Sequence, residues 1–150
     1  MWKYLNVLLA ATFFLMSGCA MTKPAPVVSP EELTLQEVHE INLSKDAIFT
    51  KSLEWMAQAF AYSTQVIELQ DKENGKIIGK GMTEFYNGDM PTPCRFTMTI
   101  EAKDKKYRVT YSNFTGMWGA ARNLPRPLWH AGHIEQVKAK LKKLDATLYA

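Results

Sequence analysis

Two segments of the chain carry apolar residues at helical spacing. The first follows Ser44, whose hydroxyl is suited to accept a hydrogen bond from the first turn of a helix. Its apolar residues recur every three or four positions, which predicts a helix over residues 45–61. The second lies at the C-terminal end and predicts the last helix of the domain. The apolar residues with this spacing are Phe49, Leu53, Met56 and Phe60 in the first segment, and Ile134, Val137, Leu141, Leu144 and Leu148 in the second.

Five other segments have the composition or the alternation of β-strands. They are residues 37–42, 66–71, 76–85, 94–101 and 107–114. The last two alternate most cleanly, with one apolar and one polar face. This pattern is typical of an antiparallel sheet that is covered on one side only. In the strand over 94–101 the apolar set is Phe96, Met98 and Ile100, and the polar set is Arg95, Thr97, Thr99 and Glu101.

The residues between these strands predict how the strands are connected. Asn74-Gly75 lies between two of them and predicts a hairpin, because both residues tolerate positive φ. Gly79 and Gly81 share a strand face with Ile77, which indicates either the close approach of a helix or a bulge. Residues 115–133 are aromatic, basic and proline-containing, and we expect a loop there. The order is therefore β-α-β-β-β-β-α, an α+β fold of two layers with two helices on one face of an antiparallel sheet.

Three segments also carry a family resemblance. They are KSLEW at 51–55, DKENGKIIGKG at 71–81 and FTMTIEAKDKKYRVTYSNF at 96–114. Together they resemble a bacterial family of domains of unknown function with a TATA-binding-protein-like (TBP-like) fold. The resemblance spans roughly residues 37–114 and implies the same element order as the periodicity. It implies an exported, lipid-anchored setting in Gram-negative envelopes, and it supplies no catalytic residues.

The N-terminal segment has the form of an export signal. Thirteen of the first 18 residues are hydrophobic, with Lys3 before the apolar run and Ser17-Gly18 before Cys19, as in a secretory signal peptide. The ending LMSGC resembles a bacterial lipobox, which implies a diacylglycerol on the Cys19 sulfur. The predicted organisation is a signal peptide over 1–18, the lipidated cysteine with a proline-rich tether over 19–32, and one domain over 33–150. Ala20 after the cysteine indicates the outer membrane of a Gram-negative bacterium.

The net charge indicates which classes of partner to expect, and the cysteine count indicates whether a disulfide can form. Removal of residues 1–18 takes one lysine from a net charge of +3 and leaves +2, which is too small to favour nucleic acid by electrostatics. We therefore expect the membrane, reached through the lipid, and an envelope protein or peptide as partners. Cys94 stands alone once Cys19 carries lipid, so we expect a buried thiol and no internal disulfide.

Candidate chemistry is sparse. His39 lies on the first predicted strand, and His130 and His133 are three residues apart, which provides at most half of a zinc site. No nucleophile motif is present, so we expect no catalytic residues, no metal and no cofactor. The prediction is a non-enzymatic binding or structural module. The alternative is a small periplasmic hydrolase or carbohydrate-active protein that uses the 115–133 loop with His130 and His133.

Two surfaces are candidates for partner binding. The first is the 115–133 loop, where tryptophan and arginine are residue types enriched at interface hot spots; alternatively, its tryptophans cap the core. The second is the polar face of the sheet, which alternatively is only a solvated surface. The candidate residues are Trp118, Arg122, Arg126 and Trp129 in the loop, and Arg95 and Arg108 on the sheet.

Overall fold

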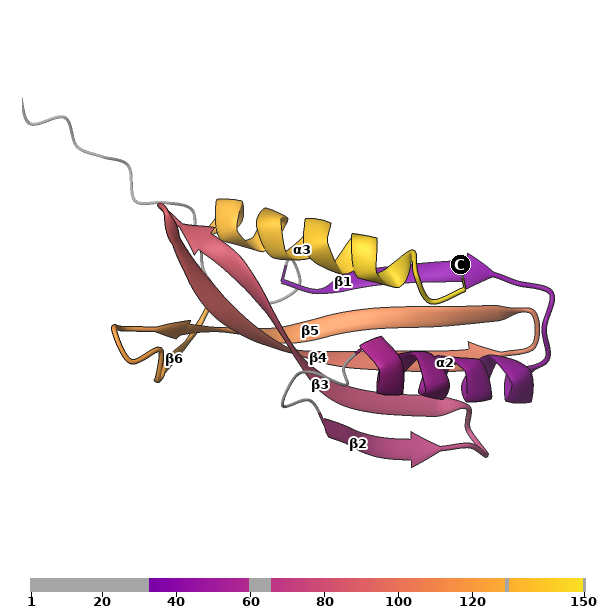
Figure 1. Ribbon diagram of the computed structural model, residues 1–150. Coiled ribbons are helices and arrows are strands. Elements are labelled where there is room, and N and C mark those ends of the chain that lie inside the picture. Colours follow the sequence, from indigo (N-terminus) through magenta and orange to yellow (C-terminus); the bar gives the residue numbers. More distant parts are fainter. Residues whose placement is uncertain (1–32, 60–65, 129, 150) are drawn as a thin grey trace, which may run out of the picture.

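The computed structural model describes residues 33–59, 66–128 and 130–149, which form one six-stranded antiparallel sheet and two helices (Figure 1). This architecture confirms the predicted α+β fold class. The segments predicted as signal peptide and tether, together with Cys19 and Trp129, lie outside the described residues. The elements are β1 (Leu35–Glu40), α2 (Lys45–Ala59), β2 (Val66–Asp71), β3 (Lys76–Asn87), β4 (Met90–Lys103), β5 (Lys106–Trp118), β6 (Leu124–Pro127) and α3 (Ala131–Asp145).

The strands follow the order β1-β5-β4-β3-β2, and β6 also pairs with β5. β1 pairs with the first half of β5, from Lys106 to Tyr111, and β6 pairs with its end, from Thr115 to Trp118. β3 and β4 form a long hairpin that pairs from Lys76 to Asn87. None of the helices in the described parts of the chain is long and apolar enough to span a membrane.

Both helices contribute to one core on one face of the sheet. Phe96, Met98 and Ile100 of β4 are at most 2% exposed, as their alternation predicts. They belong to the same apolar cluster as Met56 of α2 and Val137 of α3. The face that carries these residues is called the covered face below, and the opposite face is called the open face.

The two glycines of β3 divide between the two predicted alternatives: Gly81 admits a close approach, by an aromatic ring and not by a helix, and Gly79 lies beside a bulge. A Cβ on Gly81 would lie 2.3 Å from the ring of Phe96, its cross-strand neighbour. The space above Gly81 is therefore filled by an aromatic ring from β4. Opposite Gly79, the register of β2 shifts between Ile67 and Leu69, so this glycine lies beside a bulge.

The predicted hairpin at Asn74-Gly75 forms, with one difference in its backbone. Gly75 has φ +67°, whereas Asn74 is not among the described residues with positive φ. Asn74 instead donates from its backbone nitrogen (3.0 Å) and its Nδ2 (2.7 Å) to the carboxylate of Asp71. The turn therefore depends on an Asx interaction and one left-handed glycine.

The predicted loop over 115–133 is wrong for much of its length. Residues 115–118 continue β5, Leu124–Pro127 form β6, and α3 begins at Ala131. β5 extends because β4 runs alongside it as far as Cys94, which pairs with Gly116. The two prolines of β6 are tolerated because this short strand lies at an edge of the sheet.

Candidate functional site

The open face of the sheet is polar at its centre. Thr97 pairs with Ser112 and Thr99 pairs with Thr110 across β4 and β5. Apolar side chains border this hydroxyl ladder, and Val38 of β1 is the most exposed of them at 60%. The predicted polar face is therefore real and carries no helix of the described chain.

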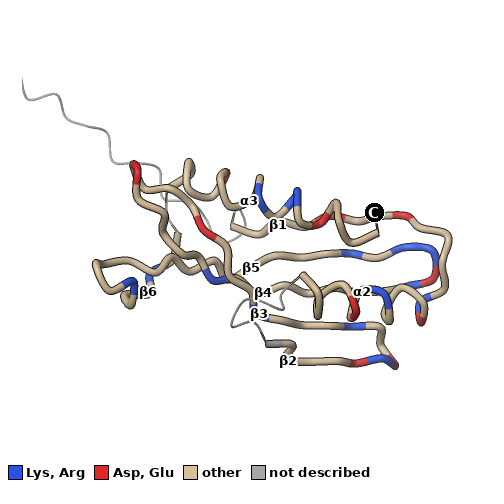
Figure 2. The backbone as a smooth tube through the Cα atoms, viewed as in Figure 1, with Lys and Arg blue, Asp and Glu red and all other residues tan. Residues whose placement is uncertain are grey.

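A hollow of about 210 Å³ lies on this face at the end where β4 turns into β5. Inside it, Nε of Arg108 donates to Oε2 of Glu101 at 2.8 Å. Lys103 and Lys106 make no ion pair within the described residues, so the hollow has an excess of positive charge. Figure 2 shows basic residues gathered at this end of β5. The lining residues are Val38, Glu101, Lys103, Lys106, Tyr107 and Arg108.

The four arginines predicted for partner binding do not form one site. Arg95 and Arg108 both lie on the open face, but Arg95 is six residues along β4 from Glu101, the partner of Arg108. At a rise of about 3.3 Å per residue this places them about 20 Å apart. Arg126 lies in β6, where it pairs with Gly116 of β5. Gly116 in turn pairs with Cys94, whose side chain is on the covered face. Arg122 lies in the β5–β6 turn with φ +52°.

Trp118 packs inward. Its ring meets Phe85 edge to face at 5.4 Å between centroids and lies 5.9 Å from the ring of His133. This arrangement matches the alternative in which the tryptophan caps the core.

The two histidines of the 115–133 segment lie close together, with the rings of His130 and His133 4.8 Å apart. Burial lowers the pKa of His133, and His130 lowers it further.

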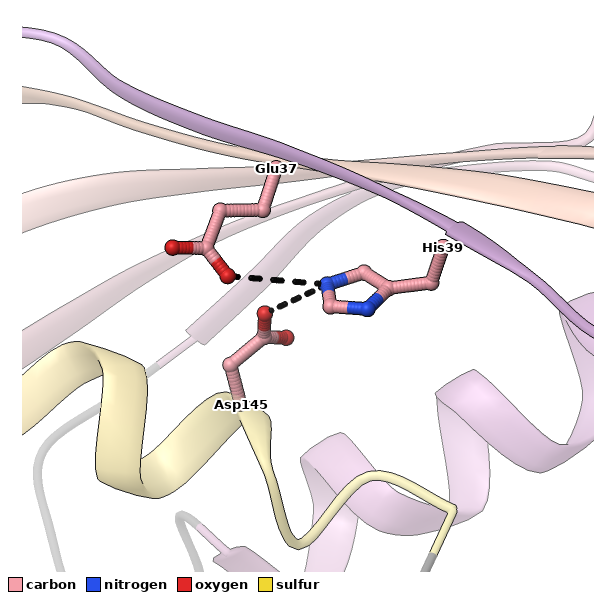
Figure 3. A group of neighbouring side chains, drawn as sticks. All are labelled: Glu37, His39 and Asp145. Atoms are coloured by element: carbon pink, nitrogen blue, oxygen red, sulfur yellow. Dashed lines mark hydrogen bonds and ion pairs between the residues drawn. The ribbon is translucent and has the colours of Figure 1, made fainter.

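A cluster on the covered side was not predicted from the sequence. Glu37 and His39 project from the same side of β1, and Asp145 reaches them from the last residue of α3 (Figure 3). Nε2 of His39 lies 2.9 Å from Oδ2 of Asp145 and 3.8 Å from Oε2 of Glu37. Glu37 and His39 are two residues apart and could have been paired on a strand. Asp145 could not, because 106 positions separate it from His39.

Burial and charge act in opposite directions on Asp145. Its side chain is 3% exposed, and this burial raises the pKa of the carboxyl group, while the neighbouring His39 lowers it. The imidazole of His39 stacks on the ring of Tyr107 at 4.9 Å. Oδ1 of Asp145 and the hydroxyl of Tyr111 are buried without a hydrogen-bond partner among the described residues. Within the described parts of the chain, Asp145 therefore has a buried carboxylate oxygen that no hydrogen bond satisfies.

Comparison with known proteins supports the fold. Residues 36–116 match the DUF4468 family, described as a domain of unknown function with a TBP-like fold. A TBP-like protein from Parabacteroides distasonis has a TM-score of 0.64 at 16% identity, over 77% of this chain and 89% of that one. A DUF4468 family protein from Bacteroides ovatus has a TM-score of 0.54 at 14% identity, over 75% and 78%. No curated protein matches the chain.

Proposed function

We propose that this chain, which belongs to the DUF4468 family of TBP-like domains, is a lipid-anchored binding module of the bacterial envelope. In this proposal it performs no catalysis, and its open face docks an acidic protein partner. The family has no known function and the structural relatives are distant, so the proposal rests on the residues of this chain. Its premise is that function depends on a site and not on a fold.

The hollow at the end of β4 and β5 is the observation that carries the docking proposal. Lys103, Lys106 and Arg108 surround it with three positive charges against the single carboxylate of Glu101. Exposed Val38 adds an apolar wall. An acidic side chain of a partner fits this combination, because its carboxylate would meet the cations while its neighbours cover Val38. Charges of this kind at an interface govern the rate and specificity of encounter more than the affinity.

The lipid on Cys19 is the second part of the proposal. The lipobox-like ending LMSGC and the prolines at 24, 26 and 30 support an anchored chain whose domain stands off the membrane on a semi-extended tether. Two acyl chains hold a protein stably in a bilayer, whereas one does not. Replacement of Cys19 by serine should release the protein from the membrane fraction. Retention of the C19S variant in membranes would contradict the anchor without affecting the docking proposal.

Site-specific photo-crosslinking in the native envelope tests the docking face. A photo-reactive residue at Thr99, in the centre of the open face, should yield one discrete crosslinked protein. The same residue at Glu135, whose side chain on α3 is 75% exposed, is the matched control and should not yield that product. The crosslink should weaken as salt concentration rises, because salt screens exposed charges.

Charge reversal makes this experiment specific. The double variant K103E/K106E should lose the crosslink from position 99, because it turns the basic hollow acidic. The variant R122E changes an exposed cation in the β5–β6 turn and should keep the crosslink. Equal crosslinking from positions 99 and 135, or a crosslink that survives K103E/K106E, would refute the open face as the docking site.

A further inference from the structure

The cluster of Glu37, His39 and Asp145 has the composition of a metal site, and the docking proposal makes no use of it. One ligand atom from each of the three side chains lies within 4.8 Å of the others. We propose that these residues bind one divalent transition-metal ion, with Zn²⁺ as the preferred ion. The ion would join the first strand of the domain to the end of its last helix.

The distances between the donor atoms agree with tetrahedral coordination. Ligands at about 2.0–2.1 Å from Zn²⁺ are separated from one another by about 3.3–3.4 Å. In this protein Nε2 of His39 is 2.9 Å from Oδ2 of Asp145 and 3.8 Å from Oε2 of Glu37, so the two spacings bracket the required value. The carboxylate oxygens of Asp145 and Glu37 also lie within 4.8 Å of each other. Small side-chain rotations that lengthen the His39–Asp145 contact and draw Glu37 inward would give all three ligands these spacings, with a fourth position left for water.

The chemistry of the donors selects the class of ion. One imidazole and two carboxylates provide mixed nitrogen and oxygen ligands, which suit Zn²⁺ better than the all-oxygen preference of Mg²⁺ or Ca²⁺. Two carboxylates also balance the charge of a divalent cation. Oδ1 of Asp145 is buried and has no hydrogen-bond partner among the described residues, so this carboxylate has an oxygen available to a further ligand.

Access and competition at the site can both be read from the structure. The side chain of His39 is 35% exposed, so an ion can enter from solvent beside β1. Nζ of Lys142 lies 3.1 Å from Oε1 of Glu37, and the side chain of Lys142 is 58% exposed. It contacts the carboxylate oxygen that does not face His39, and its positive charge opposes a metal ion. Removal of this charge should therefore tighten metal binding.

Zinc titration of the full chain, purified in detergent and freed of metal with a chelator, tests the proposal. The wild-type chain should bind one Zn²⁺ per molecule, and its thermal midpoint should rise with Zn²⁺ concentration. H39A should weaken binding by more than about a hundredfold, since loss of a direct ligand exceeds the effect of losing an outer-shell partner. H130A, which removes an exposed histidine elsewhere, is the matched control and should bind as the wild type does.

Two further variants protect the test against misfolding. E37Q keeps the size of a half-buried side chain and should still weaken Zn²⁺ binding by at least about tenfold. K142Q should bind Zn²⁺ several-fold more tightly, an effect that a purely structural role of the cluster would not produce. The proposal is refuted by the absence of saturable binding, by unchanged binding in both H39A and E37Q, or by equal losses in H39A and H130A. Displacement of Zn²⁺ by equimolar Mg²⁺ or Ca²⁺ would overturn the assignment of the ion.

Discussion

The two faces of the sheet are built from the same strands but differ in burial and polarity. Cys94 and Arg95 are adjacent in β4, yet Cys94 is fully buried under the helices and Arg95 is exposed on the open face. The period-two geometry of a strand makes this separation unavoidable. The covered face can therefore concentrate the stability of the domain while the open face remains free to bind.

The ion pairs of the open face illustrate the difference. Lys80 pairs with Glu68 and Arg108 pairs with Glu101, and in both pairs the side chains are about one-third to two-thirds exposed. Exposed pairs of this kind contribute about 0.2–1 kcal/mol each. A buried aromatic or aliphatic side chain contributes several times as much. Changes on the two faces should therefore have separable consequences.

The largest expected effect is the loss of Phe96 from the covered face. F96A should destabilise the domain by about 3–5 kcal/mol, because it leaves a cavity beneath the helices. T99A, three residues along the same strand on the open face, should change the free energy of unfolding by no more than about 0.5 kcal/mol. Urea unfolding measures both. Similar losses in the two variants would contradict the division of labour between the faces.

The reactivity of thiols should report the same contrast. Burial raises the pKa of Cys94 to about 12, while an exposed cysteine has a pKa of about 8.5. At pH 8, R95C should therefore be alkylated at position 95 about three orders of magnitude faster than Cys94 in the wild type. Peptide mass mapping over time measures the two rates. Comparable rates at positions 94 and 95 in folded protein would show that the covered face is open to solvent.

Local patterns predict the faces well because they depend only on neighbours along the chain. The alternation in 94–101 correctly assigns Phe96 and Arg95 to opposite sides, and the Asn-Gly signal correctly locates the β2–β3 hairpin. β6 was missed because its sequence, LPRP, has no strand pattern of its own. It becomes a strand only because β5 extends far enough to pair with it.

The candidate sites were less predictable than the fold. Arg108 was expected on the polar face and lies in its hollow. The cluster of Glu37, His39 and Asp145 depends on where α3 ends relative to β1, and no local pattern records that distance. Trp118 shows the opposite difficulty, because an aromatic residue beside arginines suggests an interface, whereas its ring packs on Phe85. Contacts between distant segments are set by packing that alternation does not describe.

Two turn glycines, one buried and one exposed, should show the same contrast with intermediate losses of stability. A Cβ on Gly75, at φ +67°, would lie 2.5 Å from the carbonyl oxygen of Ala102, whereas a Cβ on Gly88, at φ +62°, would meet nothing within 4 Å. G88A should cost about 1–2 kcal/mol, the strain of a left-handed alanine. G75A should cost about 2–3 kcal/mol, because the same strain is joined by a steric clash. Equal losses of unfolding free energy in the two variants would show that the Ala102 carbonyl beside Gly75 adds no steric constraint to the β2–β3 turn.

The smallest expected effect is the pH dependence of stability that Asp71 contributes at the exposed side of the β2–β3 turn. Hydrogen bonds from the side chain and backbone of Asn74 lower its pKa below the ordinary value of 3.8. Ionisation of Asp71 therefore favours the folded state, and its stabilisation is fully present above that value. The stabilisation is lost as the pH falls through the lowered pKa. The urea midpoints of wild type and D71A should thus differ at pH 6 and approach each other as the pH falls through the lowered pKa of Asp71. N74A removes the principal donor and should shrink the difference at pH 6; a difference that persists unchanged at low pH would mean that the charge of Asp71 does not support the turn.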